Sequence, residues 1–311
     1  MEVQRNVPLK KHTTFQIGGP ANYFLAARSK EELIEALNFA KEKGVTPLII
    51  GGGSNLLISD KGYGGVAIKV QNAEIEIEGE NVLVGAGVLL SSLVKKSFEK
   101  NLSGMEWAAG IPGTVGGAVA GNAGAFNGEM ADLVERVEVY DIKAGKIIDM
   151  TREECRFDYR SSIFKNNSSL VILSAALKLE EGSGDDILQK IEANLQYRRE
   201  KHPKEPSAGS CFKNISVDDL PADFFEKFPE TKESVKNGIL PTAFLIHSCG
   251  LKGEKIGSAQ VSPVHPNFIV NLNGASAGDV LELISFVKKK IEEKYGLKLQ
   301  EEIKILDHVV I

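Results

Sequence analysis

The chain has 311 residues, 42% of them hydrophobic and 25% charged, and its net charge is −5. This length suggests two domains, each large enough for its own core, and the negative charge argues against a general nucleic-acid or membrane-surface binder. The three widely spaced cysteines show no paired motif, which indicates a reducing compartment without structural disulfides. Because the sequence shows no apolar leader and no apolar run of transmembrane length, we expect a cytoplasmic protein.

The clearest predicted helix lies near the start of the chain and spans residues 29–44. Ser29 and Glu32 form a capping box at its beginning, and Gly44 ends it. Its apolar stripe consists of Leu33, Ala36, Leu37 and Ala40.

Strands dominate the rest of residues 1–180. Two apolar runs flank a glycine turn within residues 46–60, and the alternating segment 73–87 predicts a hairpin that turns at Gly79-Glu80-Asn81. Further strands are expected within residues 135–150 and 169–180. The predicted class is α+β, because strands and helices do not alternate regularly as they do in a doubly wound sheet.

The character of the sequence changes after residue 182. A helix is predicted over 185–200, and Pro203 and Pro206 stop it, so we place a domain boundary here. A second capped helix over 276–296 carries one apolar face, made of Val280, Leu283, Ile284, Val287 and Ile291. The last predicted strand, 297–306, directs Ile303 and Ile305 to one side and Glu302 and Lys304 to the other.

Two glycine-rich segments, 51–54 and 110–117, are expected to be loops beside apolar strands. Neither matches a Rossmann fingerprint or a phosphate-binding P-loop. A flexible linker at 110–129 is disfavoured, because the segment contains apolar residues such as Ile111 and Phe126 and hardly any serine. Successive N–H groups without Cβ atoms form anion-binding nests, so we expect a cradle for a phosphorylated ligand.

Several motifs resemble, in family order, those of the UDP-N-acetylenolpyruvoylglucosamine reductases. They are HTTFQIGGPA (12–21), GGGSNLLISD (51–60), GIPGTVGGAVAGNAGA (110–125), YRSSIFK (159–165), PSAGSCFKN (206–214), LIHSCGLKG (245–253), HPNFIVN (265–271) and LQEEIKI (299–305). The resemblance covers nearly the whole chain and indicates the shorter, second type of this family, because 169–200 leaves little room for the insertion of the longer type. It implies an α+β fold with a two-part FAD-binding domain of the p-cresol methylhydroxylase/vanillyl-alcohol oxidase type. The expected domains are an FAD-binding domain (1–182), a connecting helix and linker (183–205) and a C-terminal substrate-binding domain (206–311).

The resemblance also implies an activity. It is the FAD-mediated, NADPH-dependent reduction of the enolpyruvyl group of UDP-N-acetylglucosamine enolpyruvate to UDP-N-acetylmuramate, in peptidoglycan precursor synthesis. FAD is expected to be non-covalent, and the ligands are the UDP-sugar nucleotide and NADPH, with no obligate protein partner, nucleic acid or membrane. Two alternatives stay open: an FAD oxidase of the same superfold acting on another small substrate, and a non-catalytic flavin- or nucleotide-binding module.

Three residues match the catalytic positions of the family. Arg160 is the candidate cation, because a guanidinium matches a carboxylate, although an arginine in this loop could also be a plain surface residue. Ser210 matches the proton donor. The neighbouring Cys211 is the more acidic rival, but in an extended strand it faces away from Ser210 and Phe212, so we expect a packed thiol. Glu302 matches the C-terminal glutamate, with Glu301 as an alternative.

The resemblance extends to binding residues. Those expected to bind FAD are Gly51, Gly52, Gly53, Ser54, Asn55, Gly110, Ile111, Pro112, Thr114, Gly116, Gly117, Asn122 and Gly124. Those expected to bind substrate are Tyr159, Lys201, Lys213 and Asn214. Arg198, Arg199 and Lys252 are further candidates for phosphates, or are simply solvated. No metal site is expected, because none of the histidines (12, 202, 247, 265 and 308) has metal-ligand spacing to other ligands.

Overall fold

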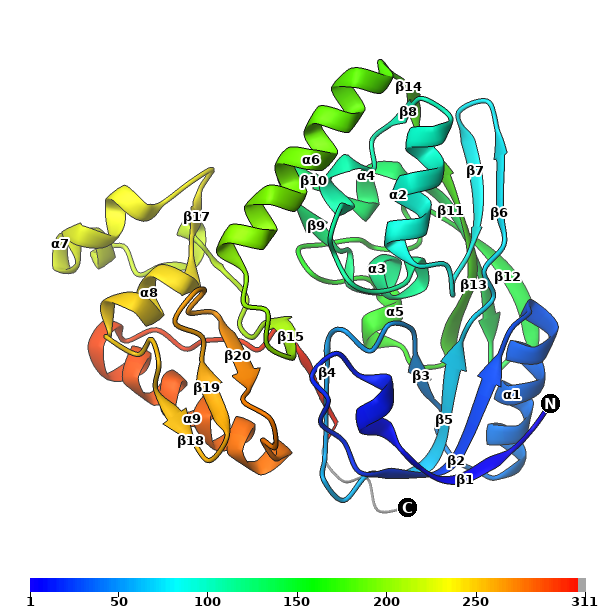
Figure 1. Ribbon diagram of the computed structural model, residues 1–311, viewed down its shortest axis with the longest axis horizontal. Helices are drawn as coiled ribbons and strands as arrows, with labels where there is room; N and C mark the ends of the chain where they lie inside the picture. Colours follow the sequence, from blue (N-terminus) through cyan, green and yellow to red (C-terminus); the bar gives the residue numbers. More distant parts are fainter. Residues whose placement is uncertain (307–311) are drawn as a thin grey trace.

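The computed structural model describes residues 1–306. Figure 1 shows a larger N-terminal body, coloured blue to green, and a smaller C-terminal body, coloured yellow to red. Helix α6 (Gly184–Lys201) follows the larger body and ends at the junction between the two. His308 lies outside the described residues.

The first lobe of the N-terminal body is a four-stranded sheet in the order β1-β2-β5-β3, with helix α1 (Lys30–Glu42) packed on it. Its strands are β1 (Gln4–Pro8), β2 (Pro20–Ala27), β5 (Tyr63–Val70) and β3 (Leu48–Ile50). The predicted apolar stripe of α1 is fully buried. Ser29 Oγ accepts a hydrogen bond from the Glu32 amide at 3.2 Å, but the Glu32 carboxylate accepts from the Arg28 amide, so only half of the predicted capping box forms.

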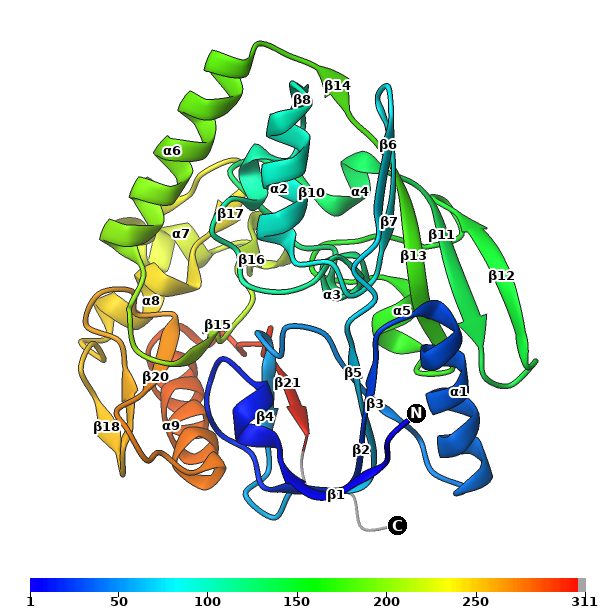
Figure 2. The same ribbon diagram turned by 45° about the vertical axis from the view of Figure 1, so that its right-hand side comes forward.

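The second lobe is a five-stranded antiparallel sheet in the order β12-β11-β13-β7-β6 (Figure 2). Its strands are β12 (Lys146–Thr151), β11 (Val134–Asp141), β13 (Leu170–Lys178), β7 (Asn81–Gly85) and β6 (Ile75–Glu78). The predicted β6–β7 hairpin is confirmed, with Glu78 paired to Asn81 across the turn. Helices α2 (Leu90–Glu99), α3 (Val115–Gly121), α4 (Met130–Leu133) and α5 (Ile163–Asn166) belong to this lobe, and α3 and α5 contact β13. Two short pairs complete it: β8 (Leu102–Ser103) with β14 (Glu180–Glu181), and β9 (Gly124–Ala125) with β10 (Gly128–Glu129).

The C-terminal body is a four-stranded sheet covered by helix α9 (Ala277–Tyr295), in the order β15-β20-β19-β18. Its strands are β15 (Ser207–Ser210), β20 (Phe268–Asn271), β19 (Ala259–Val261) and β18 (Lys255–Ile256). Helices α7 (Phe224–Lys227) and α8 (Thr242–Ser248) and the pair β16 (Ile215–Ser216) with β17 (Ile239–Leu240) complete this body. The predicted apolar face of α9 is buried, and Ser276 and Asp279 form a capping box at its start.

Two sequence predictions of local structure are wrong in part. Residues 115–117 do not belong to a glycine loop; they form the first turn of α3, which packs closely because a Cβ at Gly116 would lie 2.7 Å from the Ala86 Cβ. The last strand is much shorter than predicted: β21 covers Lys304–Leu306 only and runs parallel to β4 (Leu56–Ile58), as Figure 2 shows. The residues before β21 pair with the C-terminal body through an isolated bridge between Phe212 and Glu301.

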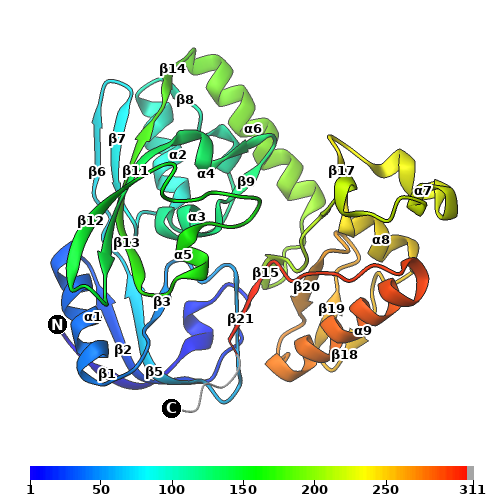
Figure 3. The same ribbon diagram turned by 180° about the vertical axis from the view of Figure 1, so that it is seen from behind.

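The two bodies share contacts at their junction, which Figure 3 shows from behind. Phe15, Ile17 and Leu57 come from the N-terminal half but pack in the hydrophobic core of the C-terminal body. Asp60 binds the first turn of α9, where its Oδ1 accepts from the Ala277 amide at 3.0 Å and its Oδ2 from the Gly278 amide at 3.3 Å. The bodies are therefore joined by buried apolar side chains as well as by the chain itself.

Candidate active site

Arg160 and Glu302 meet at the junction, although 142 residues separate them. Arg160 Nε donates to Glu302 Oε1 at 2.9 Å, and both side chains are about one-fifth exposed, at 22% and 21%. Arg160 follows β12 in the second lobe, whereas Glu302 lies on the returning C-terminal segment. The structure thus brings together two of the three catalytic candidates. Glu301 instead forms an ion pair with Lys288 of α9 at 2.8 Å.

The Arg160 side chain is held on the backbone that follows α3. Its Nη2 donates to the Gly124 carbonyl at 2.6 Å and its Nη1 to the Asn122 carbonyl at 3.4 Å. Asn122 is fully buried, with Nδ2 donating to the Asp158 carbonyl and Oδ1 accepting from the Ala131 amide. Both ends of the Asn122 side chain are therefore committed to backbone, so this side chain supports the Arg160 turn instead of facing a ligand.

Ser210, the third candidate, lies on the segment that pairs with Glu302. The Glu302 amide donates to the Cys211 carbonyl at 2.8 Å. Strand β15 has a register shift between Ser207 and Ser210, and Gly209 within it has φ +81°. An extra residue with positive φ is the signature of a β-bulge, which re-aims the side chain beside it. The Gly209 bulge therefore sets the direction of Ser210, a role that the sequence motif alone does not reveal.

The alternation expected for Ser210, Cys211 and Phe212 stays a prediction, because β15 ends at Ser210. Cys211 and Phe212 are both buried, at 2% and 1% exposure. The prediction of a packed thiol is confirmed for Cys211, and its burial raises the pKa far above the usual value. The thiol is therefore protonated and inert at neutral pH.

The Glu302 carboxyl lies in an electrostatically mixed environment. Burial raises its pKa, while the cations of Arg160, Lys165 and Lys213 oppose this rise. Lys165, from α5, belongs to the YRSSIFK motif, but sequence reasoning gave it no role. A buried carboxyl surrounded by cations is poised to hold or release a proton.

Three of the four predicted substrate-binding residues lie near the Arg160–Glu302 pair. The Asn214 amide donates to Tyr159 Oη at 3.4 Å, and Asn214 Oδ1 accepts from the Thr242 amide at 3.1 Å. Lys213 precedes Asn214 and contributes charge at Glu302. Lys201 is the last residue of α6 and is exposed. Tyr159, Lys213 and Asn214 thus surround the Arg160–Glu302 pair.

The two glycine-rich segments face each other. A Cβ at Gly51 would overlap the Thr114 hydroxyl, and one at Gly52 would lie 2.6 Å from Gly113 Cα. These glycines are required for the two segments to approach so closely. By contrast, Gly117 is exposed, and a Cβ there would meet only the Thr114 hydroxyl at 3.6 Å.

Comparison with known proteins places this geometry in a family. Residues 21–151 match the model of an FAD binding domain, and residues 201–306 match that of the UDP-N-acetylenolpyruvoylglucosamine reductase C-terminal domain. The chain is 38% identical to the UDP-N-acetylenolpyruvoylglucosamine reductase of Caldanaerobacter subterraneus subsp. tengcongensis over 303 residues, 97% of this chain and 92% of that protein. It is 40% identical to that of Alkaliphilus metalliredigens over 305 residues, again 97% and 92%. The crystal structure of the Thermus caldophilus enzyme superimposes with a TM-score of 0.79 at 35% identity, covering 99% of this chain and all of that one.

The chain belongs to the UDP-N-acetylenolpyruvoylglucosamine reductase family. It is an FAD-dependent oxidoreductase, and the predicted α+β class with an FAD-binding domain and a C-terminal domain is confirmed. Within residues 1–306, no helix is long and apolar enough to cross a membrane. The same residues contain no group of three or more histidine, cysteine, aspartate or glutamate side chains that could hold a metal ion.

The glycine segments of this reductase fit the flavin nucleotide. Thr114 is 4% exposed, and its hydroxyl has no hydrogen-bond partner among residues 1–306. A buried hydroxyl without a partner costs about 1–3 kcal/mol, so its presence points to a ligand acceptor or donor. Together with the open backbone at Gly117, it forms a cradle suited to a pyrophosphate.

Two basic residues near these segments have structural partners. Lys69 Nζ donates to the Gly51 carbonyl, and burial lowers the pKa of Lys69. Arg198 Nε donates to the Ala109 carbonyl at 2.8 Å, and its guanidinium lies 5.1 Å from the Phe126 ring centroid. Arg198 is therefore not a solvated helix charge; it fastens α6 to the second glycine segment. Sequence reasoning missed Lys69, whose only signal was a lysine inside an apolar strand.

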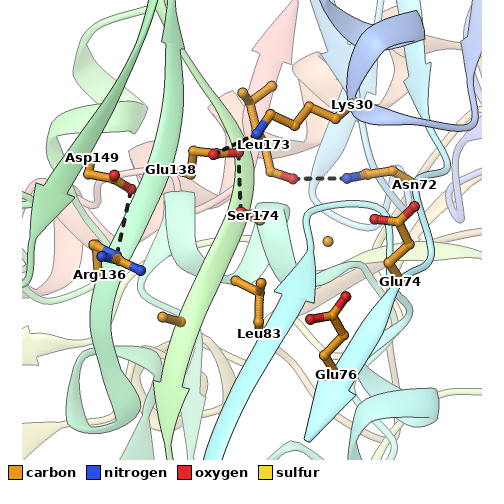
Figure 4. A pocket seen from close by; sticks show the side chains of 12 residues that line it. Lys30, Asn72, Glu74, Glu76, Leu83, Arg136, Glu138, Asp149, Leu173 and Ser174 are labelled. Atoms are coloured by element: carbon orange, nitrogen blue, oxygen red, sulfur yellow. Dashed lines mark hydrogen bonds and ion pairs between the residues drawn. The ribbon is translucent and has the colours of Figure 1, made fainter.

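A separate groove of about 230 Å³ lies on the outer face of the five-stranded sheet (Figure 4). It is lined by residues such as Ser174 and Leu83, which alternate with buried residues along their strands. Lys30 binds Glu138 at 2.6 Å and Arg136 lies 3.6 Å from Asp149, so four of its charges pair with one another. This groove is on the far side of the sheet from α3 and takes no part in the site.

Proposed function

We propose that this reductase catalyses the FAD-mediated, NADPH-dependent reduction of the enolpyruvyl group of UDP-N-acetylglucosamine enolpyruvate, giving UDP-N-acetylmuramate for peptidoglycan precursor synthesis. The observation that carries the proposal is the Arg160–Glu302 pair beside the Ser210 segment. It joins a cation and a carboxyl to the segment that carries Ser210, at the junction between the N-terminal and C-terminal bodies.

The substrate requires a cation because its alkene carries a carboxylate. When hydride adds to the distal alkene carbon, negative charge spreads into that carboxylate. The three contacts of Arg160 use three of its five N–H donors, so two remain for a substrate carboxylate. Donors that are fixed before reaction stabilise developing charge without reorganisation.

The adjacent carbon requires a proton, and we assign its delivery to Ser210. A hydroxyl is a weak acid and needs a partner that stabilises the alkoxide or replaces its proton. The raised pKa of Glu302 makes this carboxyl a suitable proton relay. The geometry favours Glu302 over Glu301 for this role, because Glu301 is paired with Lys288.

FAD would be held against the backbone of the two glycine segments, beside the place where they meet. Bound FAD supplies the hydride, which no side chain can do. We assign its pyrophosphate to the backbone of 51–55 and 110–117 and to the Thr114 hydroxyl. Asn122 and Gly124 act behind it, through the carbonyls that hold Arg160.

We assign the UDP-sugar to the C-terminal side of the site. Tyr159, Lys213 and Asn214 surround the Arg160–Glu302 pair, and Lys201 lies at the α6 end of the junction. We retain the division into an FAD-binding domain (1–182), a connecting segment (183–205) and a substrate-binding domain (206–311). A cytoplasmic location is also part of the proposal, since the three cysteines are unpaired.

An anaerobic visible spectrum tests the function directly. The purified FAD-loaded protein is titrated first with NADPH and then with UDP-N-acetylglucosamine enolpyruvate. We expect the flavin to bleach and then to regain its colour with the enolpyruvyl sugar. Bleaching that only oxygen reverses would replace the proposal with an oxidase, and flavin that no nicotinamide bleaches would reduce the protein to a binding module.

A further inference from the structure

Lys165 has no part in the function described so far, yet it touches the centre of the site. It lies on the single-turn helix α5, and its Nζ donates to the Arg160 main-chain carbonyl at 3.0 Å. Helix α5 is firmly placed, because Phe164 is buried and Ser162 Oγ donates to the Ala120 carbonyl of α3 at 2.7 Å. The Lys165 ammonium therefore approaches Arg160 from a rigid element.

The main chain of Arg160 needs such support. Its φ is +51°, in the left-handed region that glycine favours. Asp158 and Ser161 exchange two backbone hydrogen bonds, which close a tight turn around it. A non-glycine residue in a sparsely populated conformation costs about 1–3 kcal/mol and persists only where its surroundings hold it. The bond from Lys165 to the Arg160 carbonyl is one of these constraints.

Lys165 also lies within the electrostatic field of the site. It is half-buried, and its pKa is lowered chiefly by burial and then by the nearby Lys213. Glu302 acts in the opposite direction and favours the charged ammonium. Reciprocally, the Lys165 cation opposes the rise that burial imposes on the pKa of Glu302.

We propose that Lys165 is a positioning residue, whose ammonium group holds the Arg160 main chain and thereby fixes the direction of the Arg160 guanidinium toward Glu302. This inference rests on the proposed function, in which Arg160 meets the substrate carboxylate and Glu302 relays the proton. Lys165 itself does not touch the reacting atoms. Its loss should impair the step that consumes the enolpyruvyl group and spare the step that reduces the flavin.

Half-reaction kinetics test the positioning role in the FAD-loaded enzyme. Lys165→Met keeps the length of the side chain but removes its charge, Lys165→Arg keeps the charge, and Lys95→Met on the exposed face of α2 is the matched control. For Lys165→Met we expect unchanged reduction by NADPH and reoxidation by the enolpyruvyl sugar slowed about 10²-fold, mainly in kcat, as for a displaced catalytic group. Equal loss in both half-reactions, or none, would overturn the inference.

A titration without substrate tests whether the Lys165 ammonium acts on the Glu302 carboxyl. This test does not depend on the proposed function. The Glu302 carboxyl is followed by carbon-13 NMR in glutamate-labelled protein, with Glu302→Gln to assign the signal. We expect Lys165→Met to raise the pKa of Glu302, and Lys165→Arg and Lys95→Met to leave it near the wild-type position. A purely structural role would lower stability without moving this titration. If the wild-type enzyme does not turn over the enolpyruvyl sugar, the proposed function is wrong. If the wild type does so and Lys165→Met behaves like it in both experiments, the inference about Lys165 is wrong.

Discussion

Thr114 carries a prediction at the scale of a single residue. Its hydroxyl is buried at the first turn of α3, beside Gly51, and has no partner among the described residues. A protein gains nothing from such a group in its free state. The FAD-binding role proposed for Thr114 implies that this hydroxyl favours binding at a cost in folding stability.

Thr114→Val should separate these two effects. Because the methyl group replaces an unpaired hydroxyl, we expect the FAD-free protein to be as stable as wild type or more so. FAD affinity should fall by about 1.5–3 kcal/mol, roughly tenfold or more, if the hydroxyl bonds a charged phosphate. Urea unfolding and flavin-fluorescence titration measure the two quantities.

Thr231→Val is the matched control, because Thr231 is equally buried but its hydroxyl donates to the Phe228 carbonyl at 2.7 Å. This variant should lose stability and keep its FAD affinity. If Thr114→Val behaved in the same way, the Thr114 hydroxyl would have a structural role and no cofactor role.

Ser210→Ala tests the proton donor. Reduction of the flavin by NADPH should remain nearly normal, while reoxidation by the enolpyruvyl sugar should slow by about 10²–10⁴-fold, the usual contribution of a positioned acid. Stopped-flow absorbance resolves the two steps, and Ser207→Ala on the same strand is the control. Comparable slowing of both steps would contradict the assigned role.

Residue identities at the site were predictable only where a motif marked them. Arg160, Ser210 and Glu302 stand in recognisable motifs, but their pairing depends on contacts across as many as 142 residues. Lys165, Lys69 and the Gly209 bulge were missed. Their roles follow from burial and backbone geometry, which no local pattern encodes.

At the scale of elements, the caps and apolar stripes of α1 and α9 predicted the positions of these helices closely, and the prolines after residue 202 predicted the end of α6. Helix α3 was taken in part for a loop, because glycine disfavours helix and its run VGGAVAG contains three. Tertiary packing overrides that preference, since Gly116 allows close contact with Ala86. The final strand was predicted too long, because polar and apolar residues also alternate before Lys304. Of those earlier residues, Glu301 forms only an isolated bridge with Phe212.

The end of α6 joins both bodies through a chain of aromatic rings. His202 packs against His265 and Phe268 of the C-terminal body, at centroid distances of 5.7 and 5.1 Å. It also packs against Tyr197, which contacts Phe126 of the N-terminal body at 5.4 Å. Phe268 is the strand partner of Ser210, so this aromatic chain reaches the site.

This aromatic chain should make the fold sensitive to acid. Burial, together with Arg198 and His265, lowers the pKa of His202 to about 4, and burial lowers that of His265. Since both folded-state values lie below the ordinary histidine value of 6.5, their contribution to stability is complete above pH 6.5 and lost as pH falls toward 4. His202→Phe, which cannot be protonated, should flatten the fall in unfolding free energy across this window.

Urea unfolding at a series of pH values makes the measurement, with His247→Phe at an exposed position of α8 as the control. The control should follow the wild-type curve. A His202→Phe curve as steep as the wild-type curve would show that the acid sensitivity arises elsewhere.

For the whole molecule, Asp60 is the clearest polar link between the bodies. Asp60→Ala removes the carboxylate from the start of α9 and should cost about 0.5–2 kcal/mol, as for other helix caps. Because Asp60 links the two bodies, we expect calorimetry of FAD-loaded Asp60→Ala to show two transitions. The C-terminal body should unfold in the first, before the transition in which FAD is released. Ser276→Ala weakens the same helix from within its own body and should leave the unfolding concerted; identical behaviour of the two variants would refute the linking role.

The pairing of β21 with β4 has a consequence for folding during synthesis on the ribosome. A ribosome releases the chain from its N-terminus, so β4 emerges some 250 residues before Lys304–Leu306, its only strand partner among the described residues. Until then, its hydrogen-bonding edge stays open to wrong partners. The β4–β21 pair therefore forms only after residues 304–306 have been synthesised, whereas the four- and five-stranded sheets of the N-terminal body contain neither strand.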